Sequence, residues 1–426
     1  MIGISKLYLG TAELSDSLRY RRPEGRKPIV VWNLTRRCNL DCLHCYADAC
    51  PPGEPCSEVD TLAAKRVIAS LAAFGVPVLL FSGGEPLLRE DLPELAAWAG
   101  EKGIRTVVSS NGTLLDPEKA RALQQAGVSY VGISLDGLEP VHNFLRRNSA
   151  AFAQTLAGLA AARSAGLKTG LRVTLTRENI PQIREIFALS NQYQIDRICF
   201  YHLVGAGRGS RLAAMRPDAG QTRQALDMII DATAADFAAG QALLPQNKNA
   251  PGDQAPAGSQ KGLCPGYKQK EVLTVDNHAD GAYLWMRLAR ENPARARQVW
   301  ELLSLSGGAS SGVGIAAINW GGDVLPDQFW QSRVLGNVFR QSFEEIWAGR
   351  GRSQPGQEPP AEFLARLRNK QAHVQGRCGR CRFLSVCGGN FRVRAELATG
   401  NPWAEDPACY LSEQEIFGPA PYTADQ

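Results

Sequence analysis

Three cysteines lie close together in the first part of the chain, in the run from Asn33 to Tyr46. Cys38, Cys42 and Cys45 have the spacing Cys-x3-Cys-x2-Cys. Three thiolates this close can hold three corners of a [4Fe–4S] cluster, and the run contains no fourth thiol. The remaining iron of such a cluster would be open to a ligand. A zinc ion with a distant fourth ligand is the alternative, because zinc also binds clustered thiolates.

A second group of cysteines lies near the end of the chain. Cys378, Cys381 and Cys387 have the spacing Cys-x2-Cys-x5-Cys, and Cys409 follows after a gap of 21 residues. Four thiolates can complete an iron–sulfur cluster without leaving an open iron. A structural zinc ion with four cysteine ligands fits the same spacing. The chain therefore contains two candidate metal centres, one open and one closed.

The elements that must position these residues alternate between strands and helices from about residue 29 to residue 203. Near-continuous apolar runs separated by amphipathic stretches are typical of a parallel sheet built of βα units. The expected helices include Thr61–Phe74, Pro117–Gln125 and Phe152–Ala165, the second of which begins at a proline preceded by an aspartate. The expected strands are Ile29–Asn33, Val78–Phe81, Thr106–Ser109, Tyr130–Ser134, Leu171–Leu175 and Arg197–Tyr201. This pattern predicts an α/β fold, either a barrel or a doubly wound open sheet.

Polar motifs follow three of these strands, at the end where a parallel barrel places its active site. Gly83-Gly84-Glu85-Pro86 follows the second strand, Asn111-Gly112 the third, and Ser134-Leu-Asp136-Gly137 begins where the fourth strand ends. Glycines in such loops let the main chain approach a ligand closely. Each motif alone is a common turn. Together they follow the first cysteine group in the sequence, one after each successive strand, and this order indicates one shared binding site.

This order of motifs resembles the radical S-adenosylmethionine (SAM) superfamily. The resemblance implies a partial (β/α)6 barrel of the TIM type, followed here by a C-terminal auxiliary iron–sulfur cluster domain. In that superfamily the open iron binds SAM, and cleavage of SAM gives a 5′-deoxyadenosyl radical that abstracts hydrogen. The implied SAM-binding residues are His44, Tyr46, Gly83, Gly84, Glu85, Asn111, Ser134, Asp136 and Arg172.

The resemblance also implies a role for several of these residues. The glycines and Glu85 would hold the methionyl amine, Ser134 and Asn111 the ribose, and Arg172 the SAM carboxylate. His44 would pack near the adenine. From the residues alone, Arg172 is equally a surface arginine on a strand, and His44 is nearly as well explained by a structural role.

The second cysteine group resembles the auxiliary-cluster domains, of the SPASM or twitch type, found in this superfamily. Three further segments support that resemblance: Asn319–Gln328, Leu335–Val338 and Phe343–Trp347. The resemblance favours [4Fe–4S] over zinc at this centre. Where SPASM proteins usually place a cysteine after the hairpin proline, this chain has Asp327. We therefore expect two [4Fe–4S] clusters in total.

Later stretches resemble one group of radical SAM enzymes, those of haem d1 biosynthesis and of the sirohaem-based haem pathway. These stretches are residues 200–204, 271–281, 326–330, 390–394 and 403–410. The implied substrate is didecarboxysirohaem, an anionic iron tetrapyrrole, and the implied electron donor is a flavodoxin or a ferredoxin. Removal of propionate side chains is the first expectation, and removal of acetate side chains is the alternative. His202 and His278 are candidate catalytic residues that would contact the substrate iron or relay a proton, although a lone histidine is more often structural.

Two other functions compete with this one. A SPASM-type peptide maturase would use the same radical on a ribosomal peptide, but the segment before Val30 is too short for a domain that captures leader peptides. An electron-transfer or iron–sulfur sensing protein needs no SAM site. The Gly-Gly-Glu-Pro motif and the later Ser134-Leu-Asp136 run argue against it.

Composition and charge limit the classes of partner and the cellular compartment that we expect for this protein. A net charge of +5 gives no case for nucleic-acid binding, and no apolar run is long enough to span a bilayer. Nothing near Met1 reads as a signal peptide, so we expect a cytoplasmic protein, in which eleven cysteines favour metal over disulfides. Clustered arginines would bind substrate carboxylates or form a solvated basic face; they are Arg146, Arg147, Arg208, Arg211, Arg377, Arg380, Arg382, Arg392 and Arg394.

The 426 residues are enough for one barrel and an appended domain. Residues 1–28 are expected to be an N-terminal extension, 29–240 the radical SAM partial barrel and 241–263 a flexible insertion. Residues 264–350 are expected to form a bridging region with the SPASM-like hairpin, 351–374 a linker and helix, and 375–426 the auxiliary cluster segment and tail. Cys264, just beyond the insertion, is interpreted as a bystander.

Overall fold

The computed structural model describes residues 1–12, 27–242, 269–352 and 356–419 of the chain. One sheet lies at its centre, and its strands are β1 (Ile2–Gly3), β2 (Ile29–Thr35), β3 (Val78–Gly83), β4 (Arg105–Ser110), β5 (Val131–Ser134), β6 (Thr169–Leu175), β7 (Arg197–His202), β8 (Glu271–Val275), β9 (Ile315–Ile318), β10 (Asp323–Leu325) and β11 (Gly336–Asn337). They lie side by side in the order β1-β8-β7-β6-β5-β4-β3-β2-β9-β10-β11. Every pair from β8 across to β9 is parallel. The pairs at the two edges, which involve β1, β10 and β11, are antiparallel.

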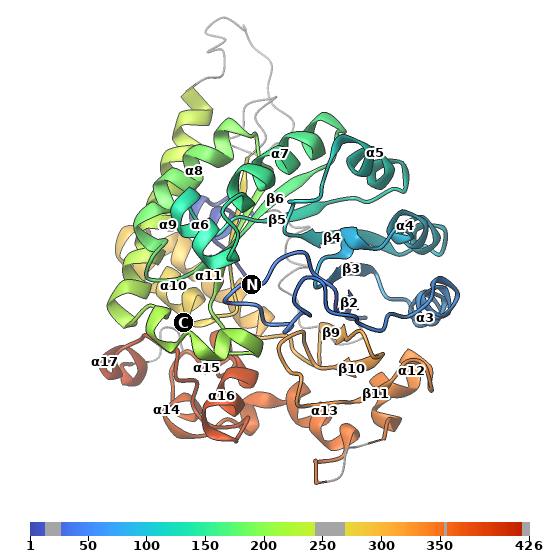
Figure 1. Cartoon of the computed structure of the whole chain (residues 1–426). Helices are drawn as coiled ribbons and strands as arrows, with labels where there is room; N and C mark the ends of the chain where they lie inside the picture. The colour runs from blue at the N-terminus through green and yellow to red at the C-terminus, as the bar shows by residue number, and fades with distance from the viewer. Residues whose placement is uncertain (13–26, 243–268, 353–355, 420–426) are drawn as a thin grey trace, which may run out of the picture.

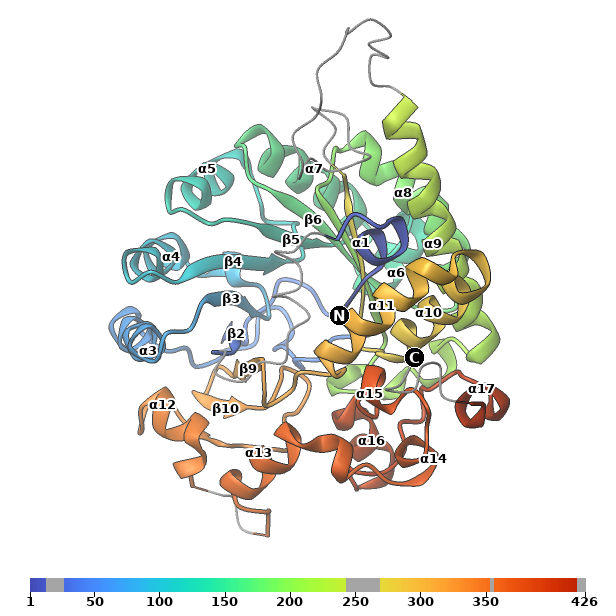
Figure 2. The same ribbon diagram turned by 180° about the vertical axis from the view of Figure 1, so that it is seen from behind.

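Helices cover the outside of the curved parallel sheet, and others belong to the C-terminal part of the chain (Figures 1 and 2). They are α1 (Ile4–Leu9), α3 (Thr61–Phe74), α4 (Leu92–Glu101), α5 (Pro117–Gln125), α6 (Glu139–Arg146), α7 (Ala151–Ser164), α8 (Ile183–Gln192), α9 (Ala219–Ala242), α10 (Ala279–Glu291), α11 (Pro293–Ser306), α12 (Phe343–Glu345), α13 (Pro360–Arg368), α14 (Gly376–Gly379), α15 (Leu384–Cys387), α16 (Arg392–Thr399) and α17 (Glu413–Phe417). In Figure 1, α3, α4 and α5 form a row outside the strands that they connect. This is the α/β arrangement of a partial barrel.

The fold class predicted from the sequence is confirmed, and the six expected strands correspond to β2–β7 within two residues at either end. Asp116 caps α5 as the sequence predicts, because its carboxylate accepts a hydrogen bond from the Lys119 amide at 2.7 Å. The parallel sheet is longer than expected. β8 pairs with β7 at one end of the parallel sheet, and β9 pairs with β2 at the other. Both added strands come from segments beyond residue 203, where no strand of this sheet was expected.

The turn after β8 is short, because α10 begins at Ala279. One local expectation is wrong. Cys50 and Cys56 form a disulfide, although the cysteines were expected to favour metal throughout. The turn at Pro52-Gly53 reverses the chain between them and brings the two thiols together. Cys264 and most of the expected insertion, from residue 243 onward, lie outside the described residues.

The C-terminal part of the chain lies along one side of the barrel. The segment from β9 to α17 occupies the lower part of the molecule in Figures 1 and 2, in orange and red. Its α15 packs against α10 and α11, so the segment with the second cysteine group contacts helices that directly follow β8. No helix in the described part of the chain has the length and apolar character needed to cross a membrane.

Candidate functional site

A cavity with an empty volume of about 990 Å³ lies where the parallel strands end. Residues from the first cysteine group and from loops after β3, β4, β5, β6, β7, β8 and β10 line it. Most of the site residues predicted from the sequence meet there: Cys38, Cys42, His44, Cys45, Tyr46, Gly83, Gly84, Asn111, Ser134, Arg172 and His202. Glu85, Asp136 and His278 are buried and are not among the lining residues.

The cysteine loop is held in place by Arg208, from the 3-10 turn that follows β7 (Gly207–Arg211). The Arg208 side chain donates hydrogen bonds to the carbonyl oxygens of Cys42 at 2.9 Å and Ala49 at 2.8 Å. Its amide donates to the carbonyl oxygen of Cys45 at 2.9 Å. Arg208 therefore fixes the loop instead of offering a free charge to a substrate.

The thiols of this loop sit where a metal cluster would fit them. Burial raises the pKa of Cys38 to about 12 and also raises the pKa of Cys42, so both thiols stay protonated unless a positive partner stabilises the thiolate. Arg146 Nη1 lies 3.6 Å from Cys42 Sγ. Among the described residues, no three His, Cys, Asp or Glu side chains converge tightly enough to hold one metal ion. Three thiols of one loop could each bind a different iron of a cluster.

The Gly83-Gly84-Glu85 motif joins β3 to the base of the cysteine loop. A Cβ atom on Gly83 would lie 2.3 Å from the Thr35 carbonyl oxygen, and one on Gly84 would lie 2.1 Å from the Arg37 carbonyl oxygen. The close approach that requires glycine is therefore to the protein's own backbone. The amides of Gly84 and Glu85 donate to those same two carbonyl oxygens, each at 2.8 Å.

The Glu85 carboxylate is fully buried and accepts three hydrogen bonds. They come from the Leu87 amide at 3.1 Å, the Ser110 hydroxyl at 2.8 Å and the Asn111 amide at 2.8 Å. Burial nevertheless raises the pKa of Glu85 to about 7. The carboxylate ties the loop after β3 to the loop after β4, so it orders two sides of the cavity at once.

Asp136 has a comparable role below the cysteine loop. His44 Nε2 lies 3.1 Å from its Oδ2 atom, and Arg146 pairs with the same carboxylate. Although burial acts in the opposite direction, the Arg146 guanidinium and His44 hold the pKa of Asp136 well below its usual range. Asp136 therefore orients His44, whose Nδ1 atom is buried without a hydrogen-bond partner. His44 itself lines the cavity.

Arg172 is the clearest unpaired cation at the cavity. Its guanidinium carbon lies 4.6 Å from the centre of the Tyr201 ring, and it forms no ion pair with any described residue. Gly132 leaves space for its side chain, since a Cβ atom there would lie 2.9 Å from Arg172 Cδ. Tyr46 and Phe329 add an aromatic wall, with ring centres 5.1 Å apart. A positive group beside aromatic faces suits an anionic, planar or carboxylate-bearing ligand.

The two candidate catalytic histidines have different surroundings. His202 lines the cavity, and its Nε2 atom lies 2.8 Å from Asp280 Oδ2. His278 lies outside the cavity, and its Nε2 atom is 3.0 Å from the Met1 amine. Burial lowers the pKa of His278 well below its usual value. The geometry therefore favours His202 for contact with a substrate.

The four C-terminal thiols come together around α14, α15 and the segment before α17. Burial raises the pKa of each of them: Cys378, Cys381, Cys387 and Cys409, the last to about 11. Ionisation of its neighbours raises the pKa of Cys387 further, because the other three thiols lie close to it. Three guanidinium Nε atoms in this segment are buried without a hydrogen-bond partner: Arg377, Arg382 and Arg392. A negatively charged four-thiolate cluster would stabilise them, so the residues fit such a group.

Asp327 occupies the position where SPASM proteins usually place a further cysteine. It is 1% exposed, and its carboxylate accepts hydrogen bonds from the Ser311 hydroxyl at 2.5 Å and the Phe329 amide at 2.9 Å. Burial raises its pKa to about 6. Its carboxylate therefore joins this turn to Ser311, earlier in the chain.

Sequence reasoning missed several features of the site. Two of the arginines interpreted as substrate-binding or solvated are instead used inside the protein, since Arg146 pairs with Asp136 and Arg394 pairs with Asp406. Arg147, Arg211 and Arg380 are exposed. Trp330, next to the cavity residue Phe329 in the chain, is fully buried away from the cavity. Asp276, which was not among the predicted site residues, lines the cavity. Its place directly after a strand end, next to other site residues, was the available signal.

Comparisons with known proteins agree with this geometry. The radical SAM superfamily matches residues 32–189, and the iron-sulfur cluster-binding domain named SPASM matches residues 311–382. Fe-coproporphyrin III synthase of Methanosarcina barkeri is 46% identical over 98% of this chain and 99% of that protein. Pre-heme d1 synthase of Dinoroseobacter shibae is 38% identical over 91% of this chain and 87% of that protein. This chain also resembles the crystal structure of Streptococcus suis SuiB bound to the precursor peptide SuiA, with a TM-score of 0.63 and 16% sequence identity. The match covers 90% of this chain and 76% of that chain, and it shows a similar fold.

Proposed function

The chain belongs to the radical SAM superfamily, in the group that acts in haem and tetrapyrrole biosynthesis, and from this premise we propose that it removes acetate side chains from an anionic iron tetrapyrrole. The radical SAM domain carries a [4Fe–4S] cluster and uses SAM, and the SPASM domain carries additional iron–sulfur. When bound, the first cluster and SAM supply hydrogen-atom abstraction by a 5′-deoxyadenosyl radical. We assign the first cluster to Cys38, Cys42 and Cys45, and one auxiliary cluster to Cys378, Cys381, Cys387 and Cys409.

The full-length likeness to Fe-coproporphyrin III synthase carries the choice of reaction. That relative is 46% identical over 98% of this chain, compared with 38% over 91% for pre-heme d1 synthase. Propionate removal was the first expectation from the sequence, and acetate removal was its alternative. The higher identity, over nearly all of both chains, favours the alternative. The proposed substrate remains didecarboxysirohaem.

The cavity residues support a substrate of this chemistry. Arg172 offers a cation without an internal carboxylate partner, and we assign it to the SAM carboxylate as the sequence predicts. His202 has Nε2 bonded to Asp280, which leaves Nδ1 for a contact with the substrate iron. Carboxylate–histidine pairs of this kind are common at metal sites, because the carboxylate fixes the tautomer and the orientation of the ring. Tyr46, Tyr201 and Phe329 would contact the flat macrocycle.

Product analysis under anaerobic conditions tests the proposed function. The protein, reconstituted with iron and sulfide, is incubated with dithionite, SAM and didecarboxysirohaem, and the tetrapyrrole is analysed by mass spectrometry. We expect SAM-dependent loss of two acetate groups and formation of 5′-deoxyadenosine. A parallel incubation without SAM should leave the tetrapyrrole unchanged. Cleavage of SAM with an unchanged tetrapyrrole would retain the radical chemistry and exclude this substrate.

Propionate removal is the second candidate, supported by the 38% identity to pre-heme d1 synthase. The same experiment separates the two, because loss of propionate and loss of acetate give different masses. Repeating the incubation with a reduced flavodoxin or ferredoxin in place of dithionite tests the proposed class of electron donor. Product formation with such a protein, at a rate at least equal to that with dithionite, is the expected result.

A further inference from the structure

Arg216 has a guanidinium group that makes no hydrogen bond or ion pair with the described part of the chain. It directly follows the 3-10 turn Ala213–Met215, and its Nε atom is buried without a hydrogen-bond partner. Burial lowers the pKa of Arg216, and the Arg394 guanidinium lowers it further, yet an arginine stays charged in proteins. An anionic acceptor that the chain does not supply would satisfy this group.

The backbone of Arg216 is fixed next to the end of β6. Arg177, two residues after that strand, donates from Nε to the Arg216 carbonyl oxygen at 2.7 Å. The Arg177 amide donates to the Met215 carbonyl oxygen at 3.0 Å. Because β6 ends at Leu175, the turn that carries Arg216 lies at the carboxyl end of the parallel sheet, which is the end that holds the cavity.

The Arg216 guanidinium lies over Gly205, in the loop that follows β7. A Cβ atom on Gly205 would collide with Arg216 Nη2 and would lie 3.2 Å from Arg216 Cζ. The guanidinium therefore occupies the space that the side chain of any other residue would fill. Leu203 and Val204, the two residues before Gly205, line the cavity. Glycine at this position lets a charged group lie at the rim of the cavity.

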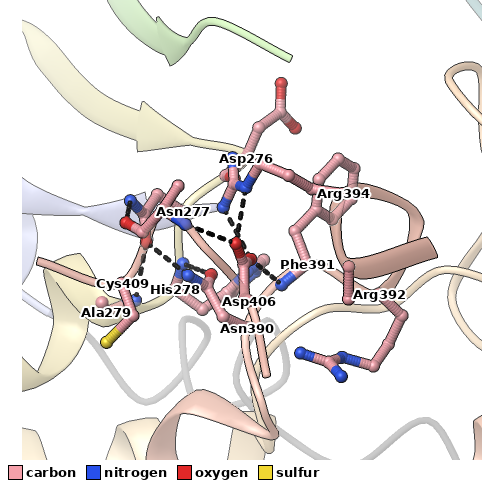
Figure 3. A network of polar contacts seen from close by, with 12 residues as sticks. Asp276, Asn277, His278, Ala279, Asn390, Phe391, Arg392, Arg394, Asp406 and Cys409 are labelled. Atoms are coloured by element: carbon pink, nitrogen blue, oxygen red, sulfur yellow. Dashed lines mark hydrogen bonds and ion pairs between the residues drawn. The ribbon is translucent and has the colours of Figure 1, made fainter. Parts of the chain in front are cut away.

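The neighbouring guanidinium, that of Arg394, is already neutralised. Figure 3 shows Arg394 paired with Asp406 beside Asp276: it donates to both Asp406 oxygens at 2.8 Å and to the Asp276 carbonyl oxygen at 3.0 Å. Asp276 lines the cavity after β8. Since the charge of Arg394 affects Arg216, Arg216 lies near the carboxyl ends of β6, β7 and β8. Unlike Arg394, it keeps a charge that no described carboxylate neutralises.

The proposed substrate is large enough to extend from the cavity to this rim. The cavity has an empty volume of about 990 Å³, and under the proposed function SAM and the tetrapyrrole would share it. Sites for one drug-sized ligand have volumes of about 300–1,000 Å³. Two ligands would therefore fill the cavity, and the peripheral side chains of the macrocycle would lie at its edge.

We propose that Arg216 binds a carboxylate side chain of the tetrapyrrole at the rim of the cavity. The proposal rests on the proposed function, since it requires a substrate whose periphery carries carboxylates. A guanidinium matches the planar carboxylate with two parallel hydrogen bonds. Arg172 lines the cavity itself and is assigned to SAM, so the two arginines hold different ligands. Arg216 thereby orients the macrocycle relative to the SAM site.

Binding of iron coproporphyrin III, the expected product class, tests this inference without turnover. Reconstituted protein is titrated anaerobically, and the dissociation constant is read from the absorbance of the macrocycle. Arg216→Gln should raise the dissociation constant about tenfold, because a hydrogen bond between charged groups is lost. The tetramethyl ester, which has no carboxylates, should bind equally to the natural protein and the variant. Arg184→Gln removes the same charge from an exposed position on α8, and this control should keep the natural affinity for both ligands.

Gly205→Ala tests the position of the guanidinium while its charge is kept. The added methyl group collides with the end of a flexible side chain, so the guanidinium should move while the loop keeps its fold. We expect weaker binding of iron coproporphyrin III. Adding Gly205→Ala to Arg216→Gln should cause no further weakening, because both changes act on the same contact. Iron content and circular dichroism establish that each variant is folded.

The possible results are distinct. An Arg216→Gln protein that binds iron coproporphyrin III as tightly as the natural protein would overturn the inference. Equal weakening for the acid and the ester would also overturn it, because the loss would then not involve a carboxylate. Weakening of the same size in Arg184→Gln would show a response to overall charge, with the same consequence. Failure of the natural protein to bind iron coproporphyrin III would instead refute the proposed function, on which the inference rests.

Discussion

Asp280 lies against His202 at the edge of the cavity, with its Oδ2 atom 2.8 Å from the Nε2 atom of the imidazole. The other carboxylate oxygen, Oδ1, accepts a hydrogen bond from the Tyr410 hydroxyl at 2.8 Å. Tyr410 directly follows Cys409 in the chain. A single buried carboxylate therefore joins a cavity residue of the barrel to the segment of the auxiliary cluster. The position of the His202 ring depends on both parts of the protein.

Asp280→Asn should impair the reaction without affecting SAM cleavage in the absence of substrate. An asparagine keeps the size of the side chain but weakens the bond that fixes the His202 tautomer. Changes at partners of metal-binding histidines typically cost 10- to 100-fold, and we expect a loss of about that size in tetrapyrrole product. Formation of 5′-deoxyadenosine without tetrapyrrole should stay near the natural rate.

Tyr410→Phe should have a smaller effect on product formation than Asp280→Asn. It removes one hydrogen bond to Asp280 and leaves the bond to His202 in place, so the loss of product should be smaller. Both products are measured by liquid chromatography of the same reaction. Equal product rates in the Asp280→Asn variant and the natural protein would remove His202 from the proposed substrate contacts.

The sequence was sufficient to predict most of the barrel because its signals are local. Apolar runs of strand length, with helices between them, define β2–β7, and the carboxyl ends of parallel strands must share one edge. Asn111, Ser134 and Arg172 meet at the cavity for that reason. The addition of β8 and β9 depends on pairing with β7 and β2. No single run in the sequence contains that information.

Side-chain roles were harder to predict than positions. The expected contact of Glu85 with SAM stays a prediction, and the sequence did not indicate the three hydrogen bonds that its carboxylate accepts from the chain. Gly83 and Gly84 line the cavity as expected, and they also make room for the backbone of residues 35–37. Hydrogen bonds between distant loops determine these roles. A sequence motif identifies the residue type, but it does not show which other residue that side chain or backbone group will contact.

Glu85→Gln should destabilise the protein and flatten the pH dependence of its stability. The amide NH2 of glutamine would face a backbone or hydroxyl donor that now bonds to a carboxylate oxygen, at a cost of about 1–3 kcal/mol. The folded-state pKa of Glu85 is raised from 4.5 to about 7, so the folded state binds more protons than the unfolded state between those values. The contribution of Glu85 to the free energy of unfolding is therefore full below about pH 4.5 and is lost as the pH rises to about 7.

Thermal unfolding at pH 5 and pH 7 measures this effect. The Glu85→Gln variant should lose more stability relative to the natural protein at pH 5 than at pH 7. Glu90→Gln is a matched control, because Glu90 is exposed on the same loop region and should change stability little at either pH. Equal losses at the two pH values would show that Glu85 does not gain a proton on folding.

Asp406→Asn should release the auxiliary cluster while the first cluster remains. Asp406 is fully buried and paired with Arg394, and loss of one partner from such a pair typically costs 3–5 kcal/mol. Its carboxylate also accepts hydrogen bonds from the Phe391 and Ala408 amides, which fix the loop that carries Cys409. We expect iron to fall from about eight atoms per chain to about four, measured by iron analysis. Glu405→Gln, at an exposed neighbouring position, should keep all of the iron.

Cys42→Ala should remove the first cluster and abolish SAM cleavage, while the auxiliary cluster stays. Cys42 supplies one of three thiols to the proposed open cluster, and none of the other described thiols lines the cavity. Two clusters in the natural protein correspond to about eight irons per chain, so the variant should retain about four. Cys199→Ala is the control, since that buried thiol on β7 belongs to neither group and should keep both the iron and the cleavage. Full cleavage of SAM by Cys42→Ala would exclude the assigned cluster site. About twelve irons per chain in the natural protein would mean a third cluster, and would contradict the prediction of two clusters that rests on Asp327 standing where a cysteine is usual.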